Sequence, residues 1–270
     1  MKKTIWTLIL LLAILLIAIS ASADTLVLPA SLKEIEDEAF MGDTSIAEVV
    51  LPEGLEKIGK KAFANSSVNK IYMPSSITYI AEDAFSSCLV ICYGPGSSQI
   101  KGIDGLFSSQ DITASGTCGS EMEWAIVNNQ LIIFGSGNMD NYKPGESPWY
   151  EMRNDIMKLS CSGDIKTIGD YAFYNCENIE NANLSNGIVC IKTNAFALCK
   201  SLKTIILPDS IEELMDSVFY GCNSLTHVNY PKNWKIKTAY TAYGTVNYLQ
   251  NYSPFANCEK LKSIIVPEGV

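Results

Sequence analysis

The sequence lacks most of the residue patterns that carry chemistry. It contains one histidine and no Cys-x-x-Cys pair, which leaves few of the ligands that a zinc site needs. It also contains no nucleophile elbow and no phosphate-binding glycine loop. The one histidine, His227, falls at an expected outward strand position, where simple exposure accounts for it. We therefore predict that the protein is not an enzyme and holds no metal and no cofactor.

Clusters of basic residues are missing as well. The formal net charge is −9, and the lysines are scattered along the chain. An acidic chain without a basic patch has no electrostatic reason to bind nucleic acid or anionic lipid. We expect neither as a partner, and the charge by itself identifies no ligand.

Only one apolar run approaches the length of a membrane span, and it lies at the N-terminus. Residues 1–23 begin with Met-Lys-Lys, continue as an apolar run from Ile5 to Ile19 and end with Ala-Ser-Ala. These are the three regions of a secretory signal peptide, with cleavage expected after Ala23. An uncleaved anchor is the alternative, although the run is shorter than the roughly 20 residues of a spanning helix. We expect a secreted, extracellular or cell-surface protein without a stable membrane span after cleavage.

What the sequence does contain is a pattern that recurs at a spacing close to 23 residues. In Leu202 to Pro208, apolar residues at strand spacing precede a proline that ends the strand. A second apolar pair follows, then a phenylalanine on an expected short helical turn, then a cysteine three residues later. The phenylalanines of this pattern are Phe40, Phe63, Phe85, Phe173, Phe196, Phe219 and Phe255. One such repeat cannot bury its own apolar side, so the period predicts a stacked solenoid. We expect one parallel ladder in each array, with Ile71 and Ile205 pointing inward.

The repeat resembles a known family. The strand L-x-x-I-x-L-P followed by A-F-x-x-C, as in Ala172 to Cys176 and Ala195 to Cys199, is similar to the BspA-like leucine-rich repeats. The similarity covers about two-thirds of the chain. It implies a secreted or surface-attached bacterial protein, linked to adhesion and host interaction rather than to catalysis. The expected fold class is an α/β solenoid in two arrays.

The interruptions of the repeat divide the chain. After the signal peptide we predict a first array at 24–88 and a cap and linker at 89–112, for which a flexible loop is the alternative. A β-hairpin-rich capping module at 113–155 follows, with Trp124 and Trp149 either buried in the cap or binding carbohydrate. The second array covers 156–270, carries an insertion at about 231–252 and stops in mid-repeat. We expect from this last feature that the chain is a fragment of a longer protein.

The nine cysteines have a regular placement. Five of them lie three residues after a phenylalanine of the repeat, at Cys88, Cys176, Cys199, Cys222 and Cys258. Asp43 and Ser66 fill this place in the first two repeats, so no bridge is required there. We predict buried, reduced thiols that pack as small apolar residues. Disulfides, usual in exported proteins, are the alternative.

Candidate contact residues come from two sources. The outward strand positions include apolar side chains where water would favour polar ones, and such a stripe often marks a binding site. The insertion is rich in aromatic residues, which either contact a ligand or cover the neighbouring coil. The candidates are Val50, Tyr72, Ile206, His227, Trp234, Tyr240, Tyr243 and Tyr248. We expect them to bind an extracellular protein or glycan. The alternatives are a binding or spacer module of a longer secreted enzyme and a structural surface-layer component.

Overall fold

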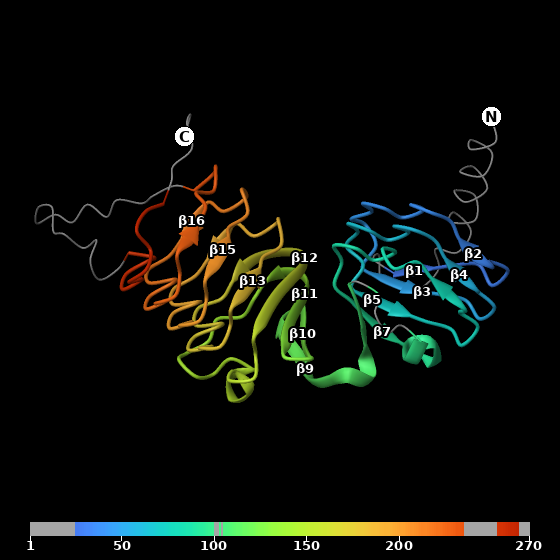
Figure 1. The fold of residues 1–270 in the computed structure, drawn as a ribbon, viewed down its shortest axis with the longest axis horizontal. Helices are drawn as coiled ribbons and strands as arrows, with labels where there is room; N and C mark the ends of the chain where they lie inside the picture. Colours follow the sequence, from blue (N-terminus) through green and yellow to red (C-terminus); the bar gives the residue numbers. More distant parts are fainter. Residues whose placement is uncertain (1–24, 100–102, 104, 235–252, 265–270) are drawn as a thin grey trace, which may run out of the picture. The chain divides into compact units, whose positions relative to one another are not determined.

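The computed structural model describes residues 25–99, 103, 105–234 and 253–264. The chain divides into two compact units, Met1–Asp111 and Ile112–Val270, which are shown in Figure 1 and are described separately. The signal peptide, the end of the second array and the candidates Tyr240, Tyr243 and Tyr248 lie outside the described residues.

The first unit is built on a five-stranded parallel sheet. The first four strands follow each other at about one repeat spacing, and the central residues Val49 and Ile71 are fully buried. The flanking residues of each strand point the other way, because side chains alternate along a strand. In spatial order the strands are β1 (Thr25–Val27), β3 (Glu48–Val50), β5 (Lys70–Tyr72), β7 (Val90–Tyr93) and β8 (Leu106–Ser108). The inward prediction for Ile71 is confirmed.

A second, smaller parallel ladder runs along the same unit. It consists of β2 (Glu34–Ile35), β4 (Lys57–Ile58) and β6 (Tyr79–Ile80). The expectation of one ladder per array is therefore wrong. The later apolar residue of the second apolar pair in each repeat, such as Ile58, lies in a strand of this second ladder. Two residues are too few to display a period of two in the sequence.

The second unit holds a nine-stranded sheet. It opens with an antiparallel meander of β9 (Ile112–Gly119), β10 (Glu121–Val127) and β11 (Gln130–Asn138). The turn between β10 and β11 contains Asn128 and Asn129, which both have positive φ (50° and 63°), as a tight hairpin requires. From β11 onward every pairing is parallel.

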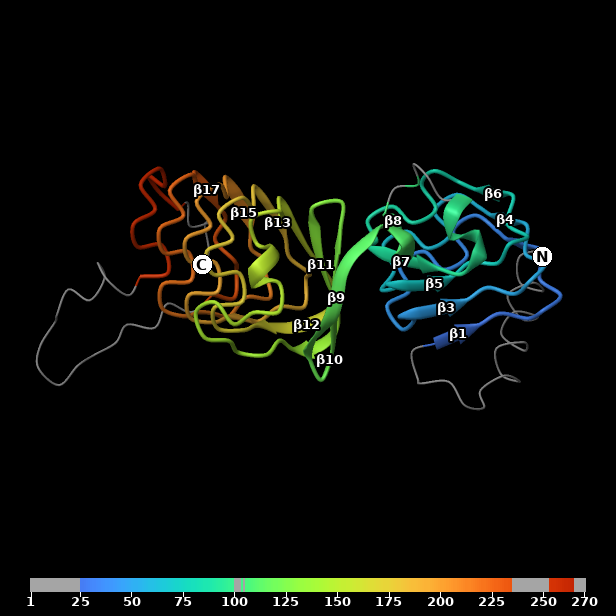
Figure 2. The same ribbon diagram turned by 90° about the horizontal axis from the view of Figure 1, so that it is seen from below.

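The long strand β12 (Lys158–Ile168) joins the meander to the repeats. Its first residues pair with β13 (Asn181–Asn183), which is followed by β15 (Thr204–Ile206) and β17 (His227–Val228). Its last two residues pair with β14 (Cys190–Ile191), which pairs with β16 (Glu213–Leu214). One strand thus starts both ladders, and the arrows of β13 and β15 follow it in order in Figure 2. Ile205 is 2% exposed, so its inward prediction is confirmed.

The phenylalanines lie on turns, and no described residue is in an α-helix. The expected helical turn, and with it the α part of the expected fold class, is corrected to a strand-rich fold with the 3-10 helices η1 (Pro95–Gln99), η2 (Ser109–Asp111) and η3 (Tyr150–Met152). Residues with positive φ flank most of the rings, such as Asn194 (55°) and Leu198 (63°) around Phe196. A left-handed residue on each side prevents helix propagation. The amide of Phe196 donates instead to the carbonyl of Val218 in the next repeat, at 2.8 Å.

Each unit has a column of stacked rings at its centre. In the first unit Phe40, Phe63 and Phe85 stack with centroids 5.1 and 5.2 Å apart. In the second unit the column starts one place before the first repeat phenylalanine, because Trp149 stacks on Phe173 at 5.5 Å. Column members further along are Phe196, Phe219 and Phe255.

Trp149 is fully buried and donates its indole N–H to the carbonyl of Ala172 at 2.8 Å. Trp124 is 5% exposed and meets Trp149 edge-on. The two tryptophans are therefore buried in the cap, as one of the two sequence interpretations has it, and they leave no exposed indole face for carbohydrate.

Candidate binding faces of the two sheets

The outward face of the first sheet carries an apolar row. Because the strands pair in register, Val27, Val50, Tyr72 and Tyr93 lie side by side across β1, β3, β5 and β7. We call these four residues the tyrosine row. Val27 and Tyr72 are 41% and 40% exposed. The rings of Tyr72 and Tyr93 stack at 5.4 Å with an interplanar angle of 26°. The structure thus joins the candidates Val50 and Tyr72 in one surface, which also includes Val27 and Tyr93.

A polar row runs parallel to the tyrosine row. It contains Thr25, Glu48 and Lys70, which are paired in register across β1, β3 and β5. The sheet therefore presents an apolar line with a charged line beside it. Such a combination provides contact area and orientation at once.

The outward face of the second sheet has a different character. Ile206 is 76% exposed, and its neighbour in register on β13 is the exposed amide Asn183. The second outward line contains Asn181, Thr204 and His227, all exposed. The Nδ1 atom of His227 is 2.9 Å from the hydroxyl oxygen of Thr226. On this face, amide, hydroxyl and imidazole side chains surround one exposed apolar residue, Ile206. The candidates Ile206 and His227 both belong to it.

Asn229 completes the edge of this sheet in a way that the sequence did not suggest. Its Nδ2 donates to the carbonyl of Leu207 at 2.8 Å, and its Oδ1 accepts from the amide of Leu207 at 2.7 Å. The side chain therefore does what a strand backbone would do. β17 ends one residue earlier, at Val228, and the amide continues the pairing beyond it. The signal was an asparagine directly after a strand, which sequence patterns do not distinguish from an ordinary turn residue.

Trp234 stands at the beginning of the insertion and packs inward. Its ring is 5.0 Å from that of Tyr230 and 6.3 Å from that of Phe255. The hydroxyl of Tyr230 donates to the carbonyl of Trp234 at 3.3 Å. Trp234 also contacts the apolar core of the unit. Of the two interpretations of this residue, covering the neighbouring coil is the one that its contacts support.

The cysteines of the repeat are buried, as predicted, and they also donate hydrogen bonds. The thiols of Cys199 and Cys222 donate to the carbonyls of Phe173 and Phe196, one repeat earlier, at 3.2 Å each. In the same way, the Cys88 thiol donates to the carbonyl of Phe63 and the Cys258 thiol donates to the carbonyl of Phe219. We call this series the thiol ladder. A purely apolar interpretation of these cysteines missed it.

The thiols of the ladder, and that of Cys176 at the same repeat position, are poor nucleophiles. Burial raises the pKa of Cys176 to about 12 and that of Cys258 to about 11. Burial also raises the pKa of Cys222 and Cys199. The thiolate is the reactive form, so at neutral pH these groups remain protonated donors. All nine cysteines are free thiols in the structure, and their oxidation state in solution stays a prediction.

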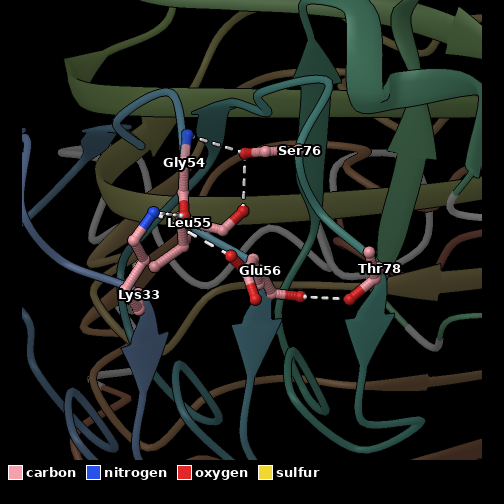
Figure 3. A network of polar contacts seen from close by, with 6 residues as sticks. All are labelled: Lys33, Gly54, Leu55, Glu56, Ser76 and Thr78. Atoms are coloured by element: carbon pink, nitrogen blue, oxygen red, sulfur yellow. Dashed lines mark hydrogen bonds and ion pairs between the residues drawn. The ribbon is translucent and has the colours of Figure 1, made fainter.

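A polar network on the flank of the first unit connects three successive repeats (Figure 3). Ser76 Oγ accepts from the amide of Gly54 at 2.8 Å and donates to the carbonyl of Leu55 at 2.7 Å. Lys33 Nζ reaches back from the preceding repeat to the carbonyl of Gly54 at 3.1 Å. Thr78 donates its hydroxyl to a backbone carbonyl of the middle repeat at 3.0 Å. These bonds use backbone groups of the turns, and they connect the repeats next to the smaller ladder of β2, β4 and β6. We infer that the network stabilises this ladder.

Within residues 25–99, 103, 105–234 and 253–264, no group of histidine, cysteine and carboxylate side chains is arranged to hold a metal ion. The same residues include no helix that is long and apolar enough to cross a membrane.

Short parallel strands at one repeat spacing, separated by turns over a stacked ring column, define a leucine-rich repeat protein. The family model of the BspA type leucine-rich repeat region matches six copies, at residues 19–113 and 148–270. The chain belongs to this family. No curated protein matches it significantly.

Solved structures of bacterial leucine-rich repeat proteins are similar at low identity. A leucine-rich repeat protein from Eubacterium ventriosum is 22% identical with a TM-score of 0.42, over 57% of this chain and 45% of its own. A leucine rich cell surface protein from Faecalibacterium prausnitzii is 20% identical with a TM-score of 0.34, over 89% of this chain and 59% of its own. The T. pallidum leucine-rich repeat protein is 20% identical with a TM-score of 0.40, over 57% and 73%. This chain thus spans about half the length of the first two.

Proposed function

We propose that this chain is a non-enzymatic binding protein, secreted or held at a cell surface, that captures an extracellular protein or glycan in adhesion or host interaction. Its contacts are the outward faces of the two sheets. The chain forms two solenoid arrays, at 24–88 and 156–270, separated by the cap and linker at 89–112 and the capping module at 113–155. The N-terminal signal pattern supports export.

The observation that carries the proposal is the exposure of large apolar side chains in register on rigid ladders. Ile206 is 76% exposed and Tyr72 is 40% exposed, although the central residue of each of these strands is buried. Isoleucine and tyrosine favour strands, but threonine does so as well and exposes less apolar surface to water. Exposed apolar side chains with polar surroundings are typical of interaction sites.

The test is a binding assay on immobilised glycans and extracellular-matrix proteins. We expect the unaltered chain to bind one ligand or more, and Tyr72→Ser or Ile206→Ser to reduce that binding at least about tenfold, since one aromatic or aliphatic anchor often supplies 1.4 kcal/mol or more. Tyr79→Ser is the matched control, because Tyr79 is 50% exposed but belongs to the other ladder. Binding that is equal in all four proteins would contradict the proposal.

A further inference from the structure

The tyrosine row has a geometry that selects the shape of its partner. Its four residues come from adjacent parallel strands, β1, β3, β5 and β7, which lie next to each other in Figure 2. The row therefore runs across the strands, and successive side chains are one strand spacing apart, about 4.8 Å. Alternate members, such as Val50 and Tyr93, are about 9.6 Å apart.

An extended peptide laid along this row would fall out of step with it. Same-side residues of a β-strand repeat at about 6.8 Å, which matches neither one nor two strand spacings. A polyproline II helix has three residues per turn and a rise of 3.1 Å, so its same-side residues repeat at about 9.3 Å. This repeat matches two strand spacings. Residues i and i+3 of such a helix would rest on Val50 and Tyr93, or on Val27 and Tyr72.

The side chains of the row suit proline as well. Tyr72 and Tyr93 cover one face of each other's ring, and Val50 is the neighbour of Tyr72 on its other side. Val50 is half-buried between two exposed neighbours, Val27 and Tyr72. A pyrrolidine ring placed over Val50 would pack against the outer face of Tyr72. Aromatic-lined grooves are the usual receptors of proline-rich helices, which lose little entropy on binding.

Charge decides between acidic and basic partners. Residues 25–99 contain ten carboxylate side chains and five lysines, a net charge of −5. The charges of Glu48 and Lys70 in the polar row cancel, so the excess of carboxylates lies on the rest of the unit and acts at longer range. A segment that carries lysine or arginine between its prolines is attracted, and an acidic segment is repelled.

We propose that the tyrosine row binds a basic, proline-rich segment in the polyproline II conformation. The inference rests on the proposed function and specifies the partner of one of its two faces. The occupant is a polyproline II segment, in a free peptide or as part of a larger protein, rather than a glycan.

The test uses a fluorescent peptide of four Pro-Pro-Lys triplets, measured by anisotropy against the whole chain. A peptide of four Gly-Gly-Lys triplets has the same charge without the helix, and four Pro-Pro-Glu triplets have the helix with the opposite charge. We expect the Pro-Pro-Lys peptide to bind at least about tenfold more tightly than either. Equal binding of the Gly-Gly-Lys peptide would mean that charge alone attracts it and would overturn the inference.

Two substitutions locate the site. Tyr72→Ser should weaken binding of the Pro-Pro-Lys peptide about tenfold, whereas Tyr72→Phe, which keeps the ring, and Tyr79→Ser should leave it within about twofold. Unchanged melting temperatures would show that the loss is not one of folding. If Pro-Pro-Lys does not bind, or if Tyr72→Ser has no effect on it, the inference fails. A Tyr72-dependent ligand found among immobilised glycans would, in that case, still support the proposed function.

Discussion

A phenylalanine is tied to the next repeat through both of its backbone polar groups. The amide of Phe173 donates to the carbonyl of Ala195 at 2.7 Å, and its carbonyl accepts from the thiol of Cys199 at 3.2 Å. The same carbonyl also accepts from the amide of Cys176 at 3.2 Å, within its own turn. The thiol is therefore a second donor to this buried acceptor, and it links the acceptor to the next repeat. Ser66 occupies the same place in the first unit and also offers a hydroxyl.

This pairing predicts a difference between two small substitutions. Cys199→Ala removes this second donor, leaves the carbonyl of Phe173 bonded within its own turn, and should lower the free energy of unfolding by about 0.5–1.5 kcal/mol. Cys199→Ser keeps a donor of similar size and should cost less. Chemical denaturation of both variants measures the difference. A larger loss for serine than for alanine would show that the site requires apolar packing and not a hydrogen bond.

At the scale of the element, the ring column explains how the repeats begin. Trp149 belongs to the capping hairpin region but takes the place of a repeat phenylalanine, stacked on Phe173 and bonded to Ala172. The first repeat thus meets a complete neighbour on its N-terminal side. In a chain of coils whose stability is mostly nearest-neighbour, the end that lacks a neighbour would otherwise fray first.

Trp149→Ala should therefore act on the whole second unit. We expect a loss of about 3–5 kcal/mol, the usual cost of truncating a buried aromatic. Trp149→Phe, which keeps the stack and loses the indole N–H, should cost less than half of that. The measurement is chemical denaturation followed by far-ultraviolet circular dichroism. A cost for alanine below about 1 kcal/mol would mean that the cap is held by other contacts.

Strands and turns could be predicted where apolar residues or turn residues recur at a regular spacing in the sequence. The inward ladder residues Ile71 and Ile205 follow from apolar spacing, and the hairpin at Asn128 follows from turn chemistry. For Trp149 the sequence left burial and carbohydrate binding both open. The second ladder could not be found in this way, because a strand of two residues such as Lys57–Ile58 has no periodicity. The turns under the rings were taken for helix because their backbone bonds go to the next repeat, which no local pattern records.

At the scale of the whole molecule, many buried thiols act in the same direction on stability. Burial raises the pKa of Cys92, Cys118 and Cys176 to about 12 each, whereas an unfolded thiol titrates near 8.5. A raised folded-state pKa contributes stability that is present below the unfolded pKa and is lost as the pH rises toward the folded pKa.

We therefore expect the free energy of unfolding to fall as the pH rises from about 9 toward 12, with little change from thiols between pH 6 and 8. Denaturation series at these pH values, under reducing conditions, give the slope. Cys176→Ser should make the alkaline slope shallower without abolishing it. A slope that is the same in this variant would assign the alkaline loss to other groups.

Contacts between distant residues limit what could be inferred about the candidate site. Val50, Tyr72 and Ile206 were placed correctly on the outward faces because alternation along a strand is local. Trp234 was uncertain because its partner Phe255 is separated from it by the insertion. The contribution of Tyr93 to the tyrosine row was hidden, because its strand lies in a stretch where the repeat pattern fades.

The bonds of the thiol ladder and of the ring turns all join one repeat to the next in the same register. A chain that gains or loses one whole repeat therefore keeps the pattern, because the bonds at the new junction join equivalent groups. The pattern also survives a longer repeat, since the thiol of Cys258 still donates to the carbonyl of Phe219, 39 residues earlier in the sequence. The number of strands in the outward face can thus change in steps of one.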